Sequence, residues 1–108
     1  MVDVKDNDIR MTRGDTAILN LSIQNADGTP YEITSDDTIL LTVKKNTTAK
    51  AIIIQKAVAD NRITITPKET ESLEYGPYCY DVELRRTDGF VATIISPHTL
   101  TLCEEVTF

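Results

Sequence analysis

The residues best suited to chemistry in this sequence are two carboxylates, Asp81 and Glu83, and a single histidine, His98. Two residues apart on a strand, the carboxylates share one face with Cα atoms roughly 7 Å apart, a spacing compatible with calcium binding or glycoside hydrolysis. However, any solvent-facing strand can carry alternating carboxylates, and a lone histidine beside Pro97 is typical of a surface bend. We therefore predict no catalytic residues, no metal site, no cofactor and no enzymatic activity.

Two further features have plain structural explanations. Arg13-Gly14-Asp15 spells an integrin-binding tripeptide, but glycine and aspartate are also what a tight turn requires. Cys79 and Cys103 belong to different strand patterns, and nothing in the sequence places them within bridging range. We expect both thiols to be free.

Composition limits the class of partner. The chain has 108 residues, a formal net charge of −6 and a pI near 4.6, so it lacks the basic patch that nucleic-acid binding requires. No run approaches the ~18 apolar residues of a membrane span, and the acidic N-terminus lacks the features of a secretory signal. We expect one domain over residues 1–108, made in the cytoplasm, with no nucleic-acid or membrane partner.

Short β-strands account for most of the sequence. The central one is expected after the helix-breaking Gly76-Pro77, where Tyr78, Tyr80, Val82 and Leu84 alternate with mostly polar residues. Alternation or β-branched content predicts further strands over residues 8–13, 16–24, 38–45, 51–57, 62–66, 90–95 and 99–107.

One short helical turn is expected near residues 67–73. Thr66 and Glu69 match a capping box around Pro67, which favours the first helical position. A helical turn that leads through a glycine into a tyrosine is typical of a tyrosine corner, and Tyr78 is the candidate. About eight short strands, one helical turn and no long helix predict an all-β protein, an antiparallel β-sandwich.

Three aliphatic residues fall on positions predicted to face outward, namely Ile18, Leu40 and Ile53. An outward aliphatic residue on a sandwich is either covered by a partner or tolerated singly. These three residues form the predicted interaction surface.

Several stretches together resemble a known family: Ile9–Thr16, Asp27–Tyr31, Leu41–Lys45, Leu73–Leu84 and the final Leu-Cys-Glu-Glu-Val-Thr. They are similar to small prophage proteins of Gram-positive bacteria and to the immunoglobulin-like N-terminal domain of the phage baseplate upper protein. The resemblance covers nearly the whole chain and implies an immunoglobulin-like sandwich. It also implies a non-enzymatic tail or baseplate component of the virion, assembled in the bacterial cytoplasm.

The resemblance also implies which partners to expect. They are other phage tail or baseplate proteins, with a homo-oligomer also possible. In the baseplate protein further segments follow this domain, whereas this sequence stops at Phe108. We therefore expect contacts to be made by the sandwich's own surfaces, through an exposed strand edge or a face.

The alternative function is a carbohydrate-binding sandwich that acts at the host cell surface. Such domains display flat aromatic rings to stack on sugars, and the candidates are Tyr31, Tyr75 and Phe90. The aromatic content is only 6%, without tryptophan, and these rings compete with core roles.

Overall fold

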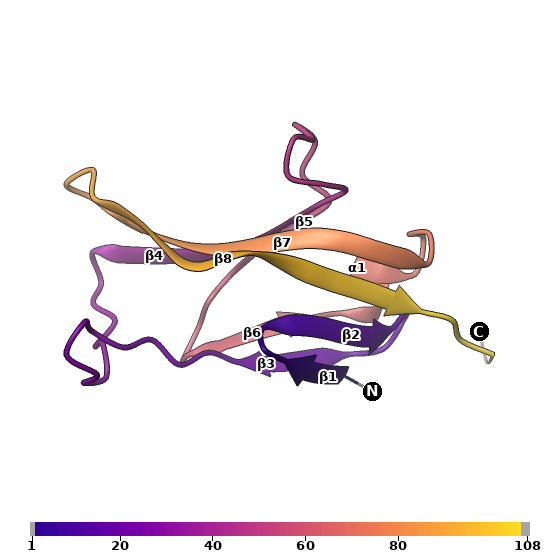
Figure 1. The fold of residues 1–108 in the computed structure, drawn as a ribbon, viewed down its shortest axis with the longest axis horizontal. Coiled ribbons are helices and arrows are strands. Elements are labelled where there is room, and N and C mark those ends of the chain that lie inside the picture. The colour runs from indigo at the N-terminus through magenta and orange to yellow at the C-terminus, as the bar shows by residue number, and fades with distance from the viewer. Residues whose placement is uncertain (1, 107–108) are drawn as a thin grey trace.

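The computed structural model describes residues 2–106, which form two packed β-sheets (Figure 1). A six-stranded sheet has the order β1-β2-β8-β7-β4-β5, and a two-stranded sheet pairs β3 with β6. The predicted all-β sandwich with one short helix is confirmed. Its elements are β1 Val2–Lys5, β2 Asp8–Thr12, β3 Ala17–Asn20, β4 Asp37–Lys44, β5 Ile54–Ala57, β6 Arg62–Ile65, α1 Pro67–Thr70, β7 Gly76–Arg86 and β8 Val91–Cys103.

The core lies between the two sheets and is filled by every second residue of the strands. On β7, Tyr78, Tyr80, Val82 and Leu84 are all buried, as their alternation predicts. Because the period is two, the intervening residues of β7 lie on the outer face of the six-stranded sheet. The other buried hydrophobic residues are Ile9, Met11, Ala17, Leu19, Ile39, Leu41, Val43, Ile54, Ile63, Ile65, Leu100 and Leu102.

The edge of the six-stranded sheet differs from the prediction in two ways. The pairing of β2 with β8 is parallel, although the other strand pairs are antiparallel. In addition, β1 forms a hairpin with β2 that the sequence analysis did not include. The turn residues Asp6 and Asn7 have φ angles of 51° and 68°, a left-handed conformation that these two residue types tolerate.

The last two predicted strands form one strand, β8. Tyr80 pairs with His98 and Val82 pairs with Ile95, so two residues of β8, Ser96 and Pro97, lie opposite a single residue of β7. This bulge gives Pro97 a place in the ladder despite its missing N–H group. The strand ends at Cys103, earlier than predicted, and residues 107–108 lie outside the described residues.

Other predicted elements are shorter in the structure. The helix ends at Thr70, and the strands expected over 16–24 and 51–57 contain only residues 17–20 and 54–57. The start of the helix is fixed as predicted, because the Glu69 carboxylate accepts hydrogen bonds from the backbone N–H and hydroxyl of Thr66 at 2.9 and 3.0 Å. Lys56 Nζ lies 3.1 Å from the same carboxylate and so ties β5 to the helix.

Candidate functional site

The outer face of the six-stranded sheet carries a groove of about 240 Å³ beside the segment that joins β4 to β5. Figure 1 shows this segment rising away from the sheet. Leu40 and Ile52 supply apolar surface, and Thr42 and Gln55 supply hydrogen-bonding groups. Both predicted carboxylates, Asp81 and Glu83, also line this cavity, which we call the sheet-face groove.

The two carboxylates of the groove differ in their surroundings. Glu83 is paired with Arg85, whose Nε atom lies 2.5 Å from Oε1. Burial raises the pKa of Asp81, the negative charge of Glu83 raises it further, and Lys44 partly offsets this shift. Asp81 is therefore the carboxylate that would gain most from a cationic group of a bound partner.

The remaining candidates for chemistry lie in separate places. His98 is half-buried on β8 rather than in the predicted bend, because the strand continues through the bulge. Its Nδ1 atom lies 2.5 Å from the carbonyl oxygen of Ser96. Cys79 lines the groove, whereas Cys103 accepts a hydrogen bond from Arg10, and both thiols are free. Residues 2–106 hold no group of three or more His, Cys, Asp or Glu side chains placed to bind a metal ion.

The three residues of the predicted interaction surface do not lie together. Ile18 is 54% exposed on the two-stranded sheet, and Leu40 is half-buried on the outer face of the other sheet. The prediction for Ile53 is wrong, since this side chain packs against the core and its neighbour Ile52 is the exposed one. The reason is that the strand begins only at Ile54, so the alternation assumed from residue 51 does not apply.

The Arg13 side chain is held within the protein. Its guanidinium donates to the Glu105 carboxylate, the Leu73 carbonyl and the Tyr75 hydroxyl, at 3.0, 3.0 and 2.9 Å. The same group lies 4.1 Å from the centre of the Tyr75 ring. These bonds join the turn after β2 to the segment before β7 and to the segment after β8. The arginine of the Arg-Gly-Asp tripeptide therefore has a structural role.

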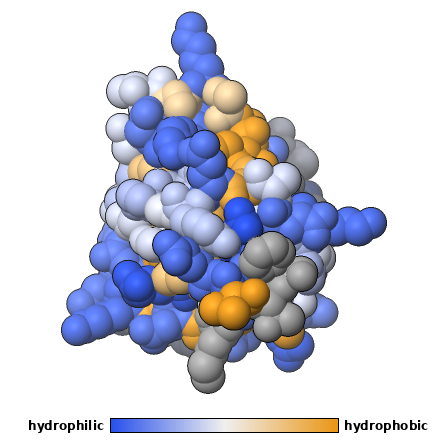
Figure 2. Space-filling view, turned by 90° about the vertical axis from the view of Figure 1, so that its right-hand side faces the viewer, coloured by the Kyte–Doolittle hydropathy of each residue, from blue (hydrophilic) through white to orange (hydrophobic). Residues whose placement is uncertain are grey.

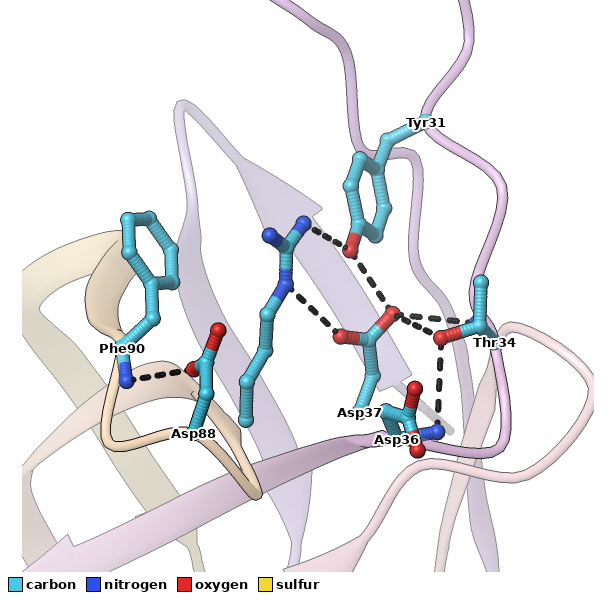
Figure 3. Close-up of polar contacts among 7 residues, drawn as sticks. Tyr31, Thr34, Asp36, Asp37, Asp88 and Phe90 are labelled. Carbon is cyan, nitrogen blue, oxygen red and sulfur yellow. Dashed lines mark hydrogen bonds and ion pairs between the residues drawn. The ribbon is translucent and has the colours of Figure 1, made fainter.

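A second arginine, Arg86, organises the opposite end of β7, where it contacts Tyr31, Asp37 and Phe90. Figure 3 shows these three partners with Thr34. Arg86 donates to the Asp37 carboxylate and to the Tyr31 hydroxyl, at 3.2 and 2.7 Å. Asp37 also accepts from the Thr34 N–H and the Tyr31 hydroxyl, at 3.0 and 2.7 Å. These hydrogen bonds, with the Arg86 charge, lower the pKa of Asp37 and stabilise the connection that precedes β4.

The aromatic rings considered for sugar stacking do not form one platform. Tyr75 precedes β7 and packs on Arg13, whereas Phe90 follows β7 and lies 4.9 Å from the Arg86 guanidinium. Tyr31 lies on the same side as Phe90, and its ring centre is 5.8 Å from Arg86. All three rings thus contact arginines that the fold already uses.

Tyr78, the tyrosine-corner candidate, is buried at the start of β7. Its hydroxyl donates to the backbone carbonyl of Glu74 at 2.8 Å. A tyrosine corner makes this type of bond, from the phenol back to the backbone a few residues upstream. The contact ties β7 to the connection after α1, which is a structural role.

The fold places this protein in the class of all-β sandwiches. No family model matches the sequence, and no curated protein matches it. Among solved structures, the crystal structure of CopC from Methylosinus trichosporium OB3b is similar, with 12% sequence identity and a TM-score of 0.46. The similarity covers 92% of this chain and 86% of that chain, and at this level we draw no functional conclusion from it.

Two observations describe the rest of the surface. Figure 2 views the end of the sandwich where both termini lie, and there the surface is mostly hydrophilic with hydrophobic side chains confined to narrow areas. Among the described residues, no helix is long and apolar enough to cross a bilayer. We take the sheet-face groove as the candidate site, because it combines apolar and polar groups in a concave surface and contains both predicted carboxylates.

Proposed function

We propose that this protein is a non-enzymatic interaction module of a phage or prophage, a tail or baseplate component that binds other virion proteins. The observation that carries the proposal is the sheet-face groove. Ile52 is 52% exposed beside Leu40, and the hydrogen-bonding groups of Thr42 and Gln55 lie around them. Protein interfaces combine a small apolar centre with a polar rim in this way.

Charge adds a preference for the partner. The pKa of Asp81 is raised by burial and by Glu83, so ionisation of Asp81 costs more free energy in the unbound groove than it does in water. A lysine or arginine of a partner placed beside Asp81 would remove this penalty. A partner that presents a basic side chain next to an apolar one fits the groove best.

The assignment to a phage particle is supported by the resemblance of the sequence motifs to prophage structural proteins and to the baseplate upper protein. The non-enzymatic part is supported by the contacts of the reactive groups. Glu83 forms an ion pair with Arg85, and Nδ1 of His98 lies next to the carbonyl oxygen of Ser96. Neither arrangement resembles a base held ready next to a nucleophile.

The proposal is tested by measuring binding of the purified protein to each tail and baseplate protein encoded in the same genome. We expect one of them to bind the wild type and to bind Leu40→Glu or Ile52→Glu at least tenfold more weakly. Val91→Glu is the matched control, because Val91 is 56% exposed but does not line the groove. Binding that all three variants leave unchanged would contradict the role of the groove.

The same protein on a glycan array tests the alternative. Binding to a glycan that is lost in Tyr31→Ala or Tyr75→Ala would favour a carbohydrate-binding sandwich instead. We expect no such binding, since the arginines that contact both rings leave less of each ring for a sugar.

A further inference from the structure

The outermost strand of the six-stranded sheet, β1, has one unpaired edge within the described residues. Its hairpin with β2 closes at Lys5 and Asp8, which flank the two-residue turn and face each other in the register. In such a hairpin the flanking residues exchange backbone hydrogen bonds, and the pairing alternates along the strand. The backbone groups of Val2 and Val4 therefore point away from β2, toward the open edge.

Apolar surface lies next to this edge. A groove of about 300 Å³ is lined by Val2 and Val4 of β1, by Ile18 of β3 and by core residues that include Ile9 and Leu19. Val4 is 51% exposed and Ile18 is 54% exposed, so both sides of the groove carry uncovered aliphatic side chains. A strand added to the β1 edge would have apolar surface to cover as well as backbone groups to pair.

The charges on β1 are complementary to those of a second copy of the same strand. In an antiparallel pair with Val4 opposite Val4, Asp3 of each copy lies opposite Lys5 of the other. Within each chain, Asp3 already faces Arg10 and Lys5 already faces Asp8. Across the four strands of the dimer, each such row then contains Arg10 and Asp3 of one copy followed by Lys5 and Asp8 of the other, so the charges alternate. One such row lies on each side of the opposed Val4 residues.

Other registers that bring the open backbone groups of both copies together are less favourable. Shifting the pair so that Asp3 faces Asp3 opposes two like charges, and shifting it the other way opposes Lys5 to Lys5. Only the register centred on Val4 opposes unlike charges on either side of the two-fold axis. The sequence of β1 therefore specifies one alignment.

We propose that this protein forms a two-fold symmetric dimer through antiparallel pairing of its β1 strands, with Val4 at the axis. The dimer joins the two six-stranded sheets and brings Val4 of one copy toward the apolar groove of the other. The direct contact is small, so we expect a weak dimer, with a dissociation constant on the order of micromolar or higher. This surface is distinct from the sheet-face groove, so the two proposals can fail independently.

The test uses sedimentation velocity of the full-length protein from about 10 µM to about 1 mM. We expect the wild type to dimerise and Asp3→Lys and Lys5→Asp each to weaken the dimer about tenfold, because each variant opposes like charges twice. An equimolar mixture of the two variants should restore dimerisation, since each pair opposed across the two copies of β1 is again unlike in the mixed dimer. Lys50→Asp, in the segment after β4, is the control and should leave the dimer unchanged.

Several results would overturn the proposal. They are a monomer at every concentration, a dimer that neither variant weakens, or a mixture that does not recover. If circular dichroism shows that a variant is unfolded, hydrogen exchange of the wild type decides the question. The Val4 amide should exchange several-fold more slowly at 1 mM than at 10 µM, and an unchanged rate would reject the dimer.

Discussion

Asp37 and Arg86 stand opposite each other at the end of the β4–β7 ladder, and their side chains form an ion pair at 3.2 Å. Only 1% of the Asp37 side chain is exposed. The pair connects two residues that lie 49 positions apart in sequence and holds the long connection before β4 against the turn between β7 and β8, where the Thr87 N–H also donates to the Asp36 carbonyl.

This relationship predicts how stability depends on pH. The folded-state pKa of Asp37 lies below its ordinary value, chiefly because of the Thr34 N–H and the Tyr31 hydroxyl, so its contribution is present above the unfolded pKa near 3.8 and is lost as the pH falls. Asp37→Asn should therefore destabilise the protein at pH 7, and the difference from wild type should shrink toward pH 3. Urea unfolding at both values measures this, with the exposed neighbour Asp36→Asn as control.

Tyr80 should ionise only at strongly alkaline pH. Burial, together with the negative charge of Asp8, raises the pKa of Tyr80 to about 12. The stability that this residue contributes is complete below the unfolded pKa of 10 and is lost between about pH 10 and pH 12. Absorbance at 295 nm during an alkaline titration should show a tyrosinate that forms near pH 12, and this contribution should be absent in Tyr80→Phe and present in Tyr75→Phe.

The same tyrosine supports the β1–β2 hairpin, because its hydroxyl donates to the backbone carbonyl of Asn7, 73 residues away. Loss of this bond in Tyr80→Phe should cost about 1 kcal/mol at neutral pH. The substitution should also accelerate amide hydrogen exchange more in β1 and β2 than in β4. Equal effects on all strands would argue against a specific role of the bond in the hairpin.

Asp81 should behave in the opposite way to Asp37. Its folded-state pKa is raised, so the stability associated with its protonated form is present below pH 3.8 and is lost as the pH rises through the folded pKa. Asp81→Asn should therefore stabilise the protein at pH 7 and have little effect at pH 3. Thermal melts of both proteins at these two values measure the effect, and a destabilised variant at pH 7 would contradict it.

Neighbouring leucines on β4 test which face of the sheet is buried. Leu41 is 1% exposed in the core, whereas Leu40 is half-buried on the outer face. Leu41→Ala should cost about 2–5 kcal/mol of unfolding free energy, and Leu40→Ala less than about 1.5 kcal/mol. Equal costs in chemical unfolding would show that the register of β4 is different.

Much of the fold could be predicted because the signals are local. Alternation on β7 identified its buried face, and the Thr66–Glu69 pattern fixed the start of the helix. Three consecutive isoleucines at residues 52–54 carry no alternation, so the prediction placed Ile53 on the wrong side. The strand β1 is short and highly charged, and its signal was limited to two alternating valines and an Asp-Asn turn.

The candidate site could be predicted only in part, for the same reason. The shared face of Asp81 and Glu83 followed from their spacing, but the groove around them depends on where the segment after β4 lies. The bonds of Arg13 to Glu105 join residues 92 positions apart, and no local pattern indicates them. The continuation of β8 through Pro97 likewise depends on its pairing with β7 on both sides of the bulge.

The parallel pairing of β2 with β8 has a mechanical consequence. Tension applied between the start of β2 and the end of β8 pulls the two strands past each other along their length, so their inter-strand bonds are loaded together in shear. The β1–β2 hairpin, in contrast, would unzip one pair at a time from its open end at Val2. When this protein is stretched between its two ends, β1 should therefore separate from β2 at low force. The β2–β8 pair should separate only at a higher force, and its inter-strand bonds should break together.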